Sequence, residues 1–242
     1  MLVANIENKL KPFILKDKDY KETDFRSEDK PMLEAFKSIY YTDNFAIATN
    51  SFMVGVCFLS DNHSLNMNGD LFDNVLKIVK KEQEADEPYK ITIDREEVIN
   101  ALVNQKKQLK SQIKTLTTDE QNKFKRSKRR LLTRFNVYYE KPNVFLNIKT
   151  QFECMEEYTN RASTIELSRE KQARLTADIQ KGNGQKVVDS WECYFQTDFI
   201  SKCLKFVAGK QITLFSKANG TVSPVWCESK DRMFMLWPVR VY

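Results

Sequence analysis

The residues with the clearest chemical potential are basic, and they are concentrated in one segment of the 242-residue chain. Residues 105–134 hold seven Lys and four Arg but only two acidic residues, so the segment has a net charge of +9. Because the whole chain carries +6, the remaining residues together carry −3. A positive segment on a mildly acidic protein favours contact with a polyanion such as the nucleic-acid backbone. The alternative is that the lysines only form a solvated helix face.

Groups that could catalyse a reaction are sparse. The sequence has no P-loop, no GxGxxG and no nucleophile elbow, and its single histidine, His63, lies in a polar, loop-like stretch. The cysteines show no CxxC spacing; they are Cys57, Cys154, Cys193, Cys203 and Cys227. We therefore expect no metal site, no cofactor, and buried thiols in a reducing compartment.

A cluster of acids needs a separate interpretation. Asp94, Glu96 and Glu97 lie where a predicted strand meets a predicted helix. Negative charges are favourable at a helix N-terminus, so this role is preferred over a nuclease or transferase site. The sequence as a whole therefore predicts a protein that is not an enzyme.

Hydrophobic periodicity in the first third of the chain predicts short helices and a run of three strands. Helices are expected near residues 6–10 and over residues 29–41, followed by strands with turns at residues 42–44 and 50–51. Residues 60–70 are expected to form a loop. Residues 70–86 are either a helix or a connector, and a domain boundary is expected near residue 88.

From residue 89 the pattern predicts β-α-β-β-β twice, an internal repeat that indicates an α+β fold. Strands are expected at residues 134–140, 143–150 and 162–168, and residues 169–186 are expected to be a connector, partly helical or not. A strand with Trp191, Cys193 and Phe195 on one face then leads into a helix capped by Thr197 or Asp198. Three strands close the chain.

The predicted helix that begins near residue 95 carries two stripes. Its apolar stripe consists of Val98, Leu102, Leu109, Ile113 and Leu116. Its basic stripe consists of Lys106, Lys107, Lys110 and Lys114. Thr117 and Glu120 then have the spacing of a capping box, so residues 119–132 are either a second short helix or a flexible insertion.

Residues 187–242 run strand, helix and three strands, and end on an apolar strand with Pro and Arg. This order resembles the closing half of the final domain of DNA polymerase sliding clamps of the bacterial β type. ITIDREEVINAL resembles the opening strand and helix of that domain, and FAIATNSFMVGVCF resembles the ATDGHRLAV strand of the preceding domain. The resemblance implies clamp-like domains, with antiparallel sheets and two helices packed on one side of them.

The domain organisation follows from the same resemblance. Residues 1–88 would form an abbreviated clamp-like domain, and residues 89–242 a complete closing domain with a basic insertion around residues 105–134. Three features differ from the family: the chain has room for two domains rather than three, the +9 segment has no obvious counterpart, and Asn50-Ser51-Phe52-Met53 replaces Asp-Gly-His-Arg. A compact two-domain clamp is similar to the trimeric clamps of some phages.

The function implied by the resemblance is that of a DNA sliding clamp or clamp-like processivity factor. It would bind double-stranded DNA without sequence preference and tether a DNA polymerase or other replication protein. Three two-domain chains would form a homo-oligomeric ring in the cytoplasm, with no membrane partner, since no stretch approaches about 18 uninterrupted apolar residues. The alternative is a non-ring clamp-fold accessory module that binds nucleic acid or a replication protein, and the abbreviated first domain favours this version.

Two sets of site residues are expected. The DNA-binding set is Lys106, Lys107, Lys110, Lys114, Lys123, Lys125, Arg126, Lys128, Arg129, Arg130, Lys202 and Lys205. The partner-peptide pocket is implied at Thr49, Val54, Trp237, Pro238, Val239 and Arg240. Because proline cannot donate to a sheet ladder, the closing strand is expected to be an edge or bulged strand. Alternatively, Trp237 and Val239 are ordinary core residues.

Overall fold

The computed structural model describes residues 3–16, 30–60, 71–84, 88–126, 130–140, 143–152, 173–180, 191–217 and 223–239. The helices are α1 (Val3–Leu10), the 3-10 helix η1 (Lys11–Phe13), α2 (Lys30–Phe36), α3 (Leu71–Gln83), α4 (Arg95–Thr115), α5 (Thr118–Arg126) and α6 (Thr197–Phe206). The strands are β1 (Tyr40–Tyr41), β2 (Phe45–Thr49), β3 (Met53–Phe58), β4 (Tyr89–Asp94), β5 (Leu131–Glu140), β6 (Asn143–Phe152), β7 (Ala173–Gln180), β8 (Trp191–Gln196), β9 (Gln211–Ser216), β10 (Val225–Ser229) and β11 (Arg232–Leu236).

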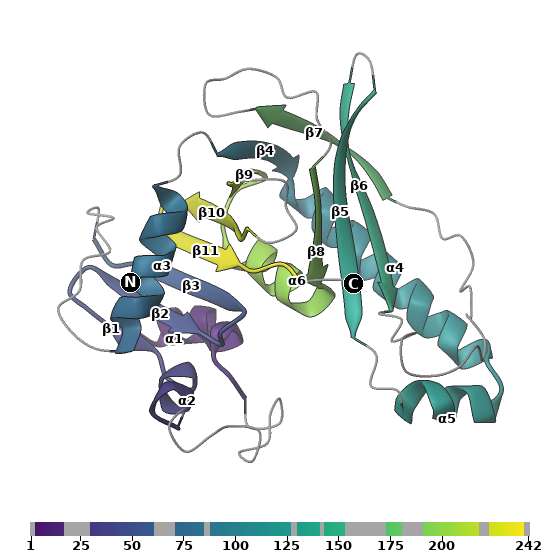
Figure 1. Ribbon diagram of the computed structural model, residues 1–242, viewed down its shortest axis with the longest axis horizontal. Coiled ribbons are helices and arrows are strands. Elements are labelled where there is room, and N and C mark those ends of the chain that lie inside the picture. The colour runs from purple at the N-terminus through teal and green to yellow at the C-terminus, as the bar shows by residue number, and fades with distance from the viewer. Residues whose placement is uncertain are drawn as a thin grey trace.

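The strands form one antiparallel sheet in the order β1-β2-β3-β11-β10-β9-β4-β7-β6-β5-β8 (Figure 1). The predicted internal repeat is visible in its pairing. The first strand of each copy pairs with the strand that follows the helix of the other copy, β4 with β9 and β8 with β5. The α+β class with antiparallel strands is therefore confirmed.

The two faces of the sheet are covered by different helices (Figure 1). On one face, α1, α4 and α6 enclose a core that includes Phe13, Leu102 and Leu204. On the other face, α2 and α3 lie over the β2–β3–β11 end, where Leu76 and Val79 of α3 join a second cluster. Strands β2 and β3 are buried along their whole length because helices cover both of their faces.

The helix-crossing arrangement confirms the main expectation for the closing half of the chain. Helices α4 and α6 contact one another on one face, as expected for two helices on one side of the sheet. Residues 70–86, for which two interpretations were open, contain helix α3. Thr117 and Glu120 form the predicted capping box: the Thr117 amide donates to Glu120 Oε2 at 2.9 Å, and the Glu120 amide donates to Thr117 Oγ1 at 3.4 Å.

Two expectations about strands were wrong. The connector expected over residues 169–186 contains β7, whose sequence ARLTADIQ has the alternating pattern of a half-covered strand. The closing strand is not at an edge, because β11 pairs with β10 on one side and β3 on the other. Pro238 is compatible with this position because the strand ends at Leu236, two residues before it. The strand expected at residues 162–168 lies outside the described residues, and so does the loop expected at residues 60–70 from residue 61 on.

The first part of the chain is joined to the closing part by backbone pairing. Five residues of β3 pair with five of β11, from Met53 opposite Leu236 to Cys57 opposite Arg232. Helix α1 and η1 then pack on β2 and β3 over the same face as α6, where Phe13 meets Phe206 with ring centroids 4.6 Å apart. In the part of the chain that the structure describes, no helix is long and apolar enough to cross a membrane.

Candidate nucleic-acid interface and partner site

Helix α4 positions the first group of predicted basic residues. Asp94 is its N-cap and accepts a hydrogen bond from the Glu97 amide at 3.1 Å, which confirms the helix-terminal role expected for these acids. In the apolar stripe, Val98, Leu102 and Leu109 are buried, whereas Ile113 and Leu116 are half-buried. Burial of this stripe fixes which side of the helix meets water.

The lysines of α4 lie on the side of the helix that its burial leaves open. Lys107, Lys110 and Lys114 are exposed, and Lys106 is half-buried. The Lys106 ammonium forms an ion pair with Asp198 in the first turn of α6. Three exposed ammonium groups on one helix face can therefore contact a partner from the solvent side. The fourth, that of Lys106, is partly neutralised by Asp198.

Helix α6, which contacts α4, carries a second pair of lysines. Ile200, Cys203 and Leu204 are buried, which leaves Lys205 exposed and Lys202 half-buried. The Lys202 ammonium lies 5.3 Å from the centroid of the Phe199 ring, a cation–π distance that holds its stem along the helix. The contact between α4 and α6 thus joins two lysine-bearing helices, through an ion pair between residues that are 92 positions apart in the sequence.

The remaining basic residues of the predicted set are placed only in part. Lys123, Lys125 and Arg126 belong to α5, but their side chains are not described. Arg130 is exposed immediately before β5. Lys128 and Arg129 lie outside the described residues. The described lysines of the predicted set thus belong to α4 and α6, two helices that contact one another on one face of the sheet.

The predicted partner pocket begins at the β2–β3 hairpin. Its turn is built by Asn50, whose side-chain oxygen accepts hydrogen bonds from the amides of Phe52 and Met53, each at 3.1 Å. Ser51 takes a positive φ of 71°, and Thr49 closes the turn by donating to the Met53 carbonyl at 3.0 Å. As a result, Phe52 projects from the turn and keeps 47% of its surface exposed.

The C-terminal segment crosses beside this hairpin. The Trp237 amide donates to the Phe52 carbonyl at 3.0 Å, and the Val239 amide donates to the Tyr194 carbonyl of β8 at 2.7 Å. Pro238, which has no amide hydrogen, lies between these two bonds. The segment after β11 is therefore hydrogen-bonded both to the hairpin and to β8, which is the edge strand at the other end of the sheet from β1.

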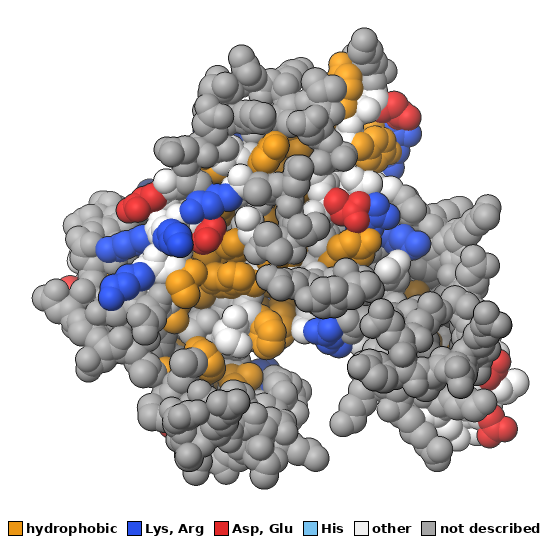
Figure 2. Space-filling model, in the orientation of Figure 1, with side chains coloured by type: hydrophobic (Ala, Val, Ile, Leu, Met, Phe, Trp, Pro, Cys, Tyr) orange, Lys and Arg blue, Asp and Glu red, His pale blue; other side chains and the backbone are white. Residues whose placement is uncertain are grey.

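The side chains of the predicted pocket divide into core and surface. Thr49 and Val54 are buried, whereas Trp237, Pro238 and Val239 are half-buried. Trp237 packs against the cluster formed by β2, β3, β11 and α3. Figure 2 shows hydrophobic side chains around a hollow on this face, over the region where Figure 1 draws β2 and β3. Arg240 lies outside the described residues.

Sequence reasoning missed the aromatic contact between the hairpin and α6. The Phe52 and Phe199 rings are stacked, with centroids 5.7 Å apart and planes 30° from parallel. Phe52 was recognised only as a departure from the polar residues of the clamp family. A hydrophobic residue at the tip of a tight turn was the available signal, since such a position is normally polar.

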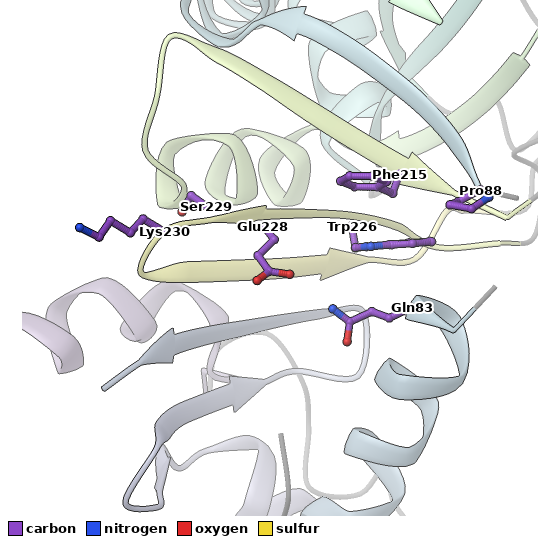
Figure 3. A pocket seen from close by; sticks show the side chains of 7 residues that line it. All are labelled: Gln83, Pro88, Phe215, Trp226, Glu228, Ser229 and Lys230. Carbon is purple, nitrogen blue, oxygen red and sulfur yellow. The ribbon is translucent and has the colours of Figure 1, made fainter. Parts of the chain in front are cut away.

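A separate pocket lies between α3 and the sheet. It has a volume of about 570 Å³ and is lined by Gln83, Pro88, Phe215, Trp226, Glu228, Ser229 and Lys230 (Figure 3). Phe215 and Trp226 stack at 5.7 Å between centroids and form its aromatic wall. Gln83 extends from the end of α3 on the opposite side and donates to the Met233 sulfur at 3.0 Å. None of these residues was expected to form a site.

The described cysteines behave as buried thiols, as expected. Burial raises the pKa of Cys57 to about 11 and that of Cys227 to about 12. Burial also raises the pKa of Cys193 and Cys203 well above 9.0. All four are free of disulfide bonds. Because burial raises their pKa values, these thiols are protonated at neutral pH and are poor nucleophiles. Among the described residues there is no group of three His, Cys, Asp or Glu side chains that could hold a metal ion; His63 and Cys154 lie outside them.

Comparison with known proteins gives matches only to solved structures. No family model and no curated protein matches the sequence. A DNA polymerase sliding clamp from Caulobacter crescentus is 10% identical with a TM-score of 0.47, and the match covers 98% of this chain and 62% of that one. The DNA polymerase III beta chain from Streptococcus pneumoniae is 11% identical with a TM-score of 0.45, covering 84% of this chain and 55% of that one.

A DNA polymerase III beta subunit from Eubacterium rectale is 13% identical with a TM-score of 0.41, and the match covers 82% of this chain and 42% of that one. The chain thus matches between 42% and 62% of the length of these three proteins. All three are described as DNA polymerase sliding clamps or beta subunits, the kind of protein that the sequence resembles.

Proposed function

We propose that this protein is a DNA sliding clamp or clamp-like processivity factor. It binds duplex DNA without sequence preference and tethers a DNA polymerase or another replication protein in the cytoplasm. The observation that carries the proposal is the contact between α4 and α6 on one face of the sheet. Both helices carry exposed lysines; these are Lys107, Lys110, Lys114 and Lys205.

The chemistry of this face suits a partner that must slide. Lysine presents a compact ammonium on a flexible stem, so it attracts phosphate without fixing a register on the bases. Phosphate contacts carry no direct sequence information, and their strength comes from counterion release. A lysine-rich face supported by a rigid sheet can therefore retain DNA while allowing movement along it, and the function requires no covalent step.

In the proposed assembly, residues 1–88 and 89–242 act as two clamp-like domains, and three chains complete a ring. Edge strands pair between subunits in this arrangement. A second candidate is a clamp-fold accessory module that does not encircle DNA. One observation favours it: among the described residues, the first segment contributes only the three strands β1, β2 and β3 to the sheet. It also shares backbone pairing with β11.

Retention on DNA with free or blocked ends tests the proposed function. Duplex DNA of equal length is prepared with open ends or with bulky protein blocks at both ends. A ring is expected to stay on the blocked duplex at high salt and to slide off the open one. Equal loss from both, with a monomeric mass by light scattering at high protein concentration, would reject the ring and leave the accessory module.

The proposed partner site is the surface formed by Phe52, Phe199 and the C-terminal segment. Phe52 has the largest exposed fraction of these described aromatics, and its backbone carbonyl already holds Trp237. Pro238 has no amide hydrogen, and the amides of Trp237 and Val239 already donate within the protein, so a peptide here is held by side chains rather than by these amides. Aromatic side chains anchor interfaces well, which supports docking of an apolar peptide from the polymerase here.

Removal of the exposed ring is expected to weaken peptide binding. Phe52→Ala keeps the backbone bond to Trp237 but removes the stacked side chain, so affinity for an apolar peptide from the polymerase of the same genome should fall by about 10- to 30-fold. Fluorescence anisotropy with the labelled peptide measures the change. Tyr139→Ala, at another exposed aromatic, is the control and should bind like the unmodified protein. Equal affinities of the two variants would place the partner elsewhere.

A further inference from the structure

A chain of buried polar side chains runs between the two lysine-bearing helices. It starts at Gln105 of α4, passes through Thr150 of β6 and Thr133 of β5, and ends at Thr197, the first residue of α6. All four side chains belong to residues that are buried, with Gln105 only 4% exposed. Polar groups in such positions are costly unless paired, so their arrangement restricts how the helices can sit on the sheet.

The Gln105 end is anchored by two bonds to the backbone of one strand. Its amide nitrogen donates to the Ile148 carbonyl at 2.8 Å, and its amide oxygen accepts from the Thr150 amide at 2.7 Å. The side chain thus engages a donor and an acceptor of β6 at once. Because both partners belong to fixed sheet backbone, these bonds set where α4 lies along β6.

The three threonine hydroxyls have one possible direction of donation. Thr197 donates its only hydroxyl hydrogen to the Leu131 carbonyl at 3.0 Å, so toward Thr133 it can only accept. Thr133 therefore donates to Thr197 across 2.9 Å and accepts from Thr150 across 3.1 Å. The chain of donation runs from Thr150 to Thr133 to Thr197 to the Leu131 carbonyl.

The prediction that Thr197 caps α6 was wrong, because its hydroxyl takes part in this network. Thr197 was predicted as a possible N-cap, but the N-cap position is Gln196, and no side chain caps the helix. The Thr197 hydroxyl is instead directed to Leu131 and Thr133. One residue further along each helix, Lys106 and Asp198 form their ion pair at the surface.

We infer that the network from Gln105 to Thr197 is a positioning device that holds α4 and α6 in one relative orientation, and so fixes the spacing of the lysines that meet DNA phosphates. The inference rests on the proposed function for its DNA part. The four network residues do not touch the DNA partner themselves; they act through the helices that carry Lys107, Lys110, Lys114 and Lys205.

A pair of substitutions at Thr133 tests the inference. Thr133→Val keeps the shape but leaves the Thr150 hydroxyl hydrogen without its acceptor, whereas Thr133→Ser keeps the hydroxyl. The folding equilibrium constant of the valine variant should fall by roughly 5- to 30-fold. Thr150→Val should cost less, because Thr133 still donates to Thr197. A larger loss for Thr150→Val than for Thr133→Val would contradict the assigned direction.

The positional part is measured without DNA. Residual dipolar couplings of the α4 and α6 amides report the angle between the two helices. The valine variant is expected to change this angle, and the serine variant to keep it. An unchanged angle in Thr133→Val would overturn the inference, whatever the protein binds.

The DNA part is measured by the dependence of affinity on salt. The slope of log K against log salt reports how many phosphates the folded protein neutralises and does not depend on the fraction that is folded. The slope should become shallower in Thr133→Val and be restored in Thr133→Ser. A changed angle with an unchanged slope would show a purely structural network. Absence of duplex binding by the unmodified protein would reject the proposed function and leave the helix-angle result to decide the network.

Discussion

Replacement of Lys107, Lys110 and Lys114 by Gln is expected to weaken binding to a short duplex about 10²-fold near 0.15 M salt. Each lysine that contacts one phosphate contributes about 0.9 to the slope of log K against log salt. Removal of three such contacts should therefore make this slope shallower by about 2.7. All three side chains are exposed, and therefore the fold should be retained. Fluorescence anisotropy at several salt concentrations gives both the affinity and the slope.

The matched control removes the same charge from the other face. Lys77 and Lys81 of α3 and Lys230 in the β10–β11 turn are exposed, and α3 covers the face opposite α4 and α6. Their replacement by Gln changes the net charge equally but should leave the salt slope nearly as it was. If both triple variants lose affinity to the same extent, net charge and not the α4–α6 face governs binding.

Substitution of Gly55 by Val is expected to destabilise the fold strongly. A Cβ at this position would lie 2.8 Å from ring atoms of Phe13, closer than real Cβ atoms approach other atoms. Phe13 cannot give way easily because it is fully buried and packs on Phe206. Overpacking commonly costs about 1–3 kcal/mol, and a β-branched side chain here should reach or exceed the upper end. Denaturant unfolding measures the change.

A double-mutant cycle separates this clash from other effects. Gly55→Ala and Phe13→Ala are each expected to destabilise the protein, the second by about 3–5 kcal/mol because it leaves a cavity. In the double variant the Cβ has room, so the combined loss should be smaller than the sum of the single losses. Strict additivity would show that Phe13 does not limit the space at Gly55.

Local sequence signals were sufficient for most helices and for the starts of α4 and α5. The apolar repeat of Val98, Leu102 and Leu109 determined which face of α4 is buried, because helix periodicity places these residues together. The capping box at Thr117 and the cap at Asp94 are also interactions between residues three positions apart. Such contacts depend on nearby residues alone, so they can be read from the sequence.

Strand pairing was the part that local signals could not give. The pattern at residues 173–180 alternates as a strand should, yet its polar composition suggested a connector. The interior position of β11 depends on β3, about 180 residues earlier in the chain, and no local feature of either strand names the other. The error about an edge strand arose because Pro238 was assigned to the strand, whereas the strand ends before it.

The predicted sites show the same division. The sequence by itself determined an α+β chain with an internal repeat, free thiols at hydrophobic positions and one strongly basic segment, because composition and periodicity carry these properties. Only the tertiary structure decided that α6 lies against α4, that Phe52 stacks on Phe199, and that Gln105 is buried on β6 rather than exposed beside Lys106. Each of these contacts joins residues more than 40 positions apart, and chain folding, not local preference, brings them together.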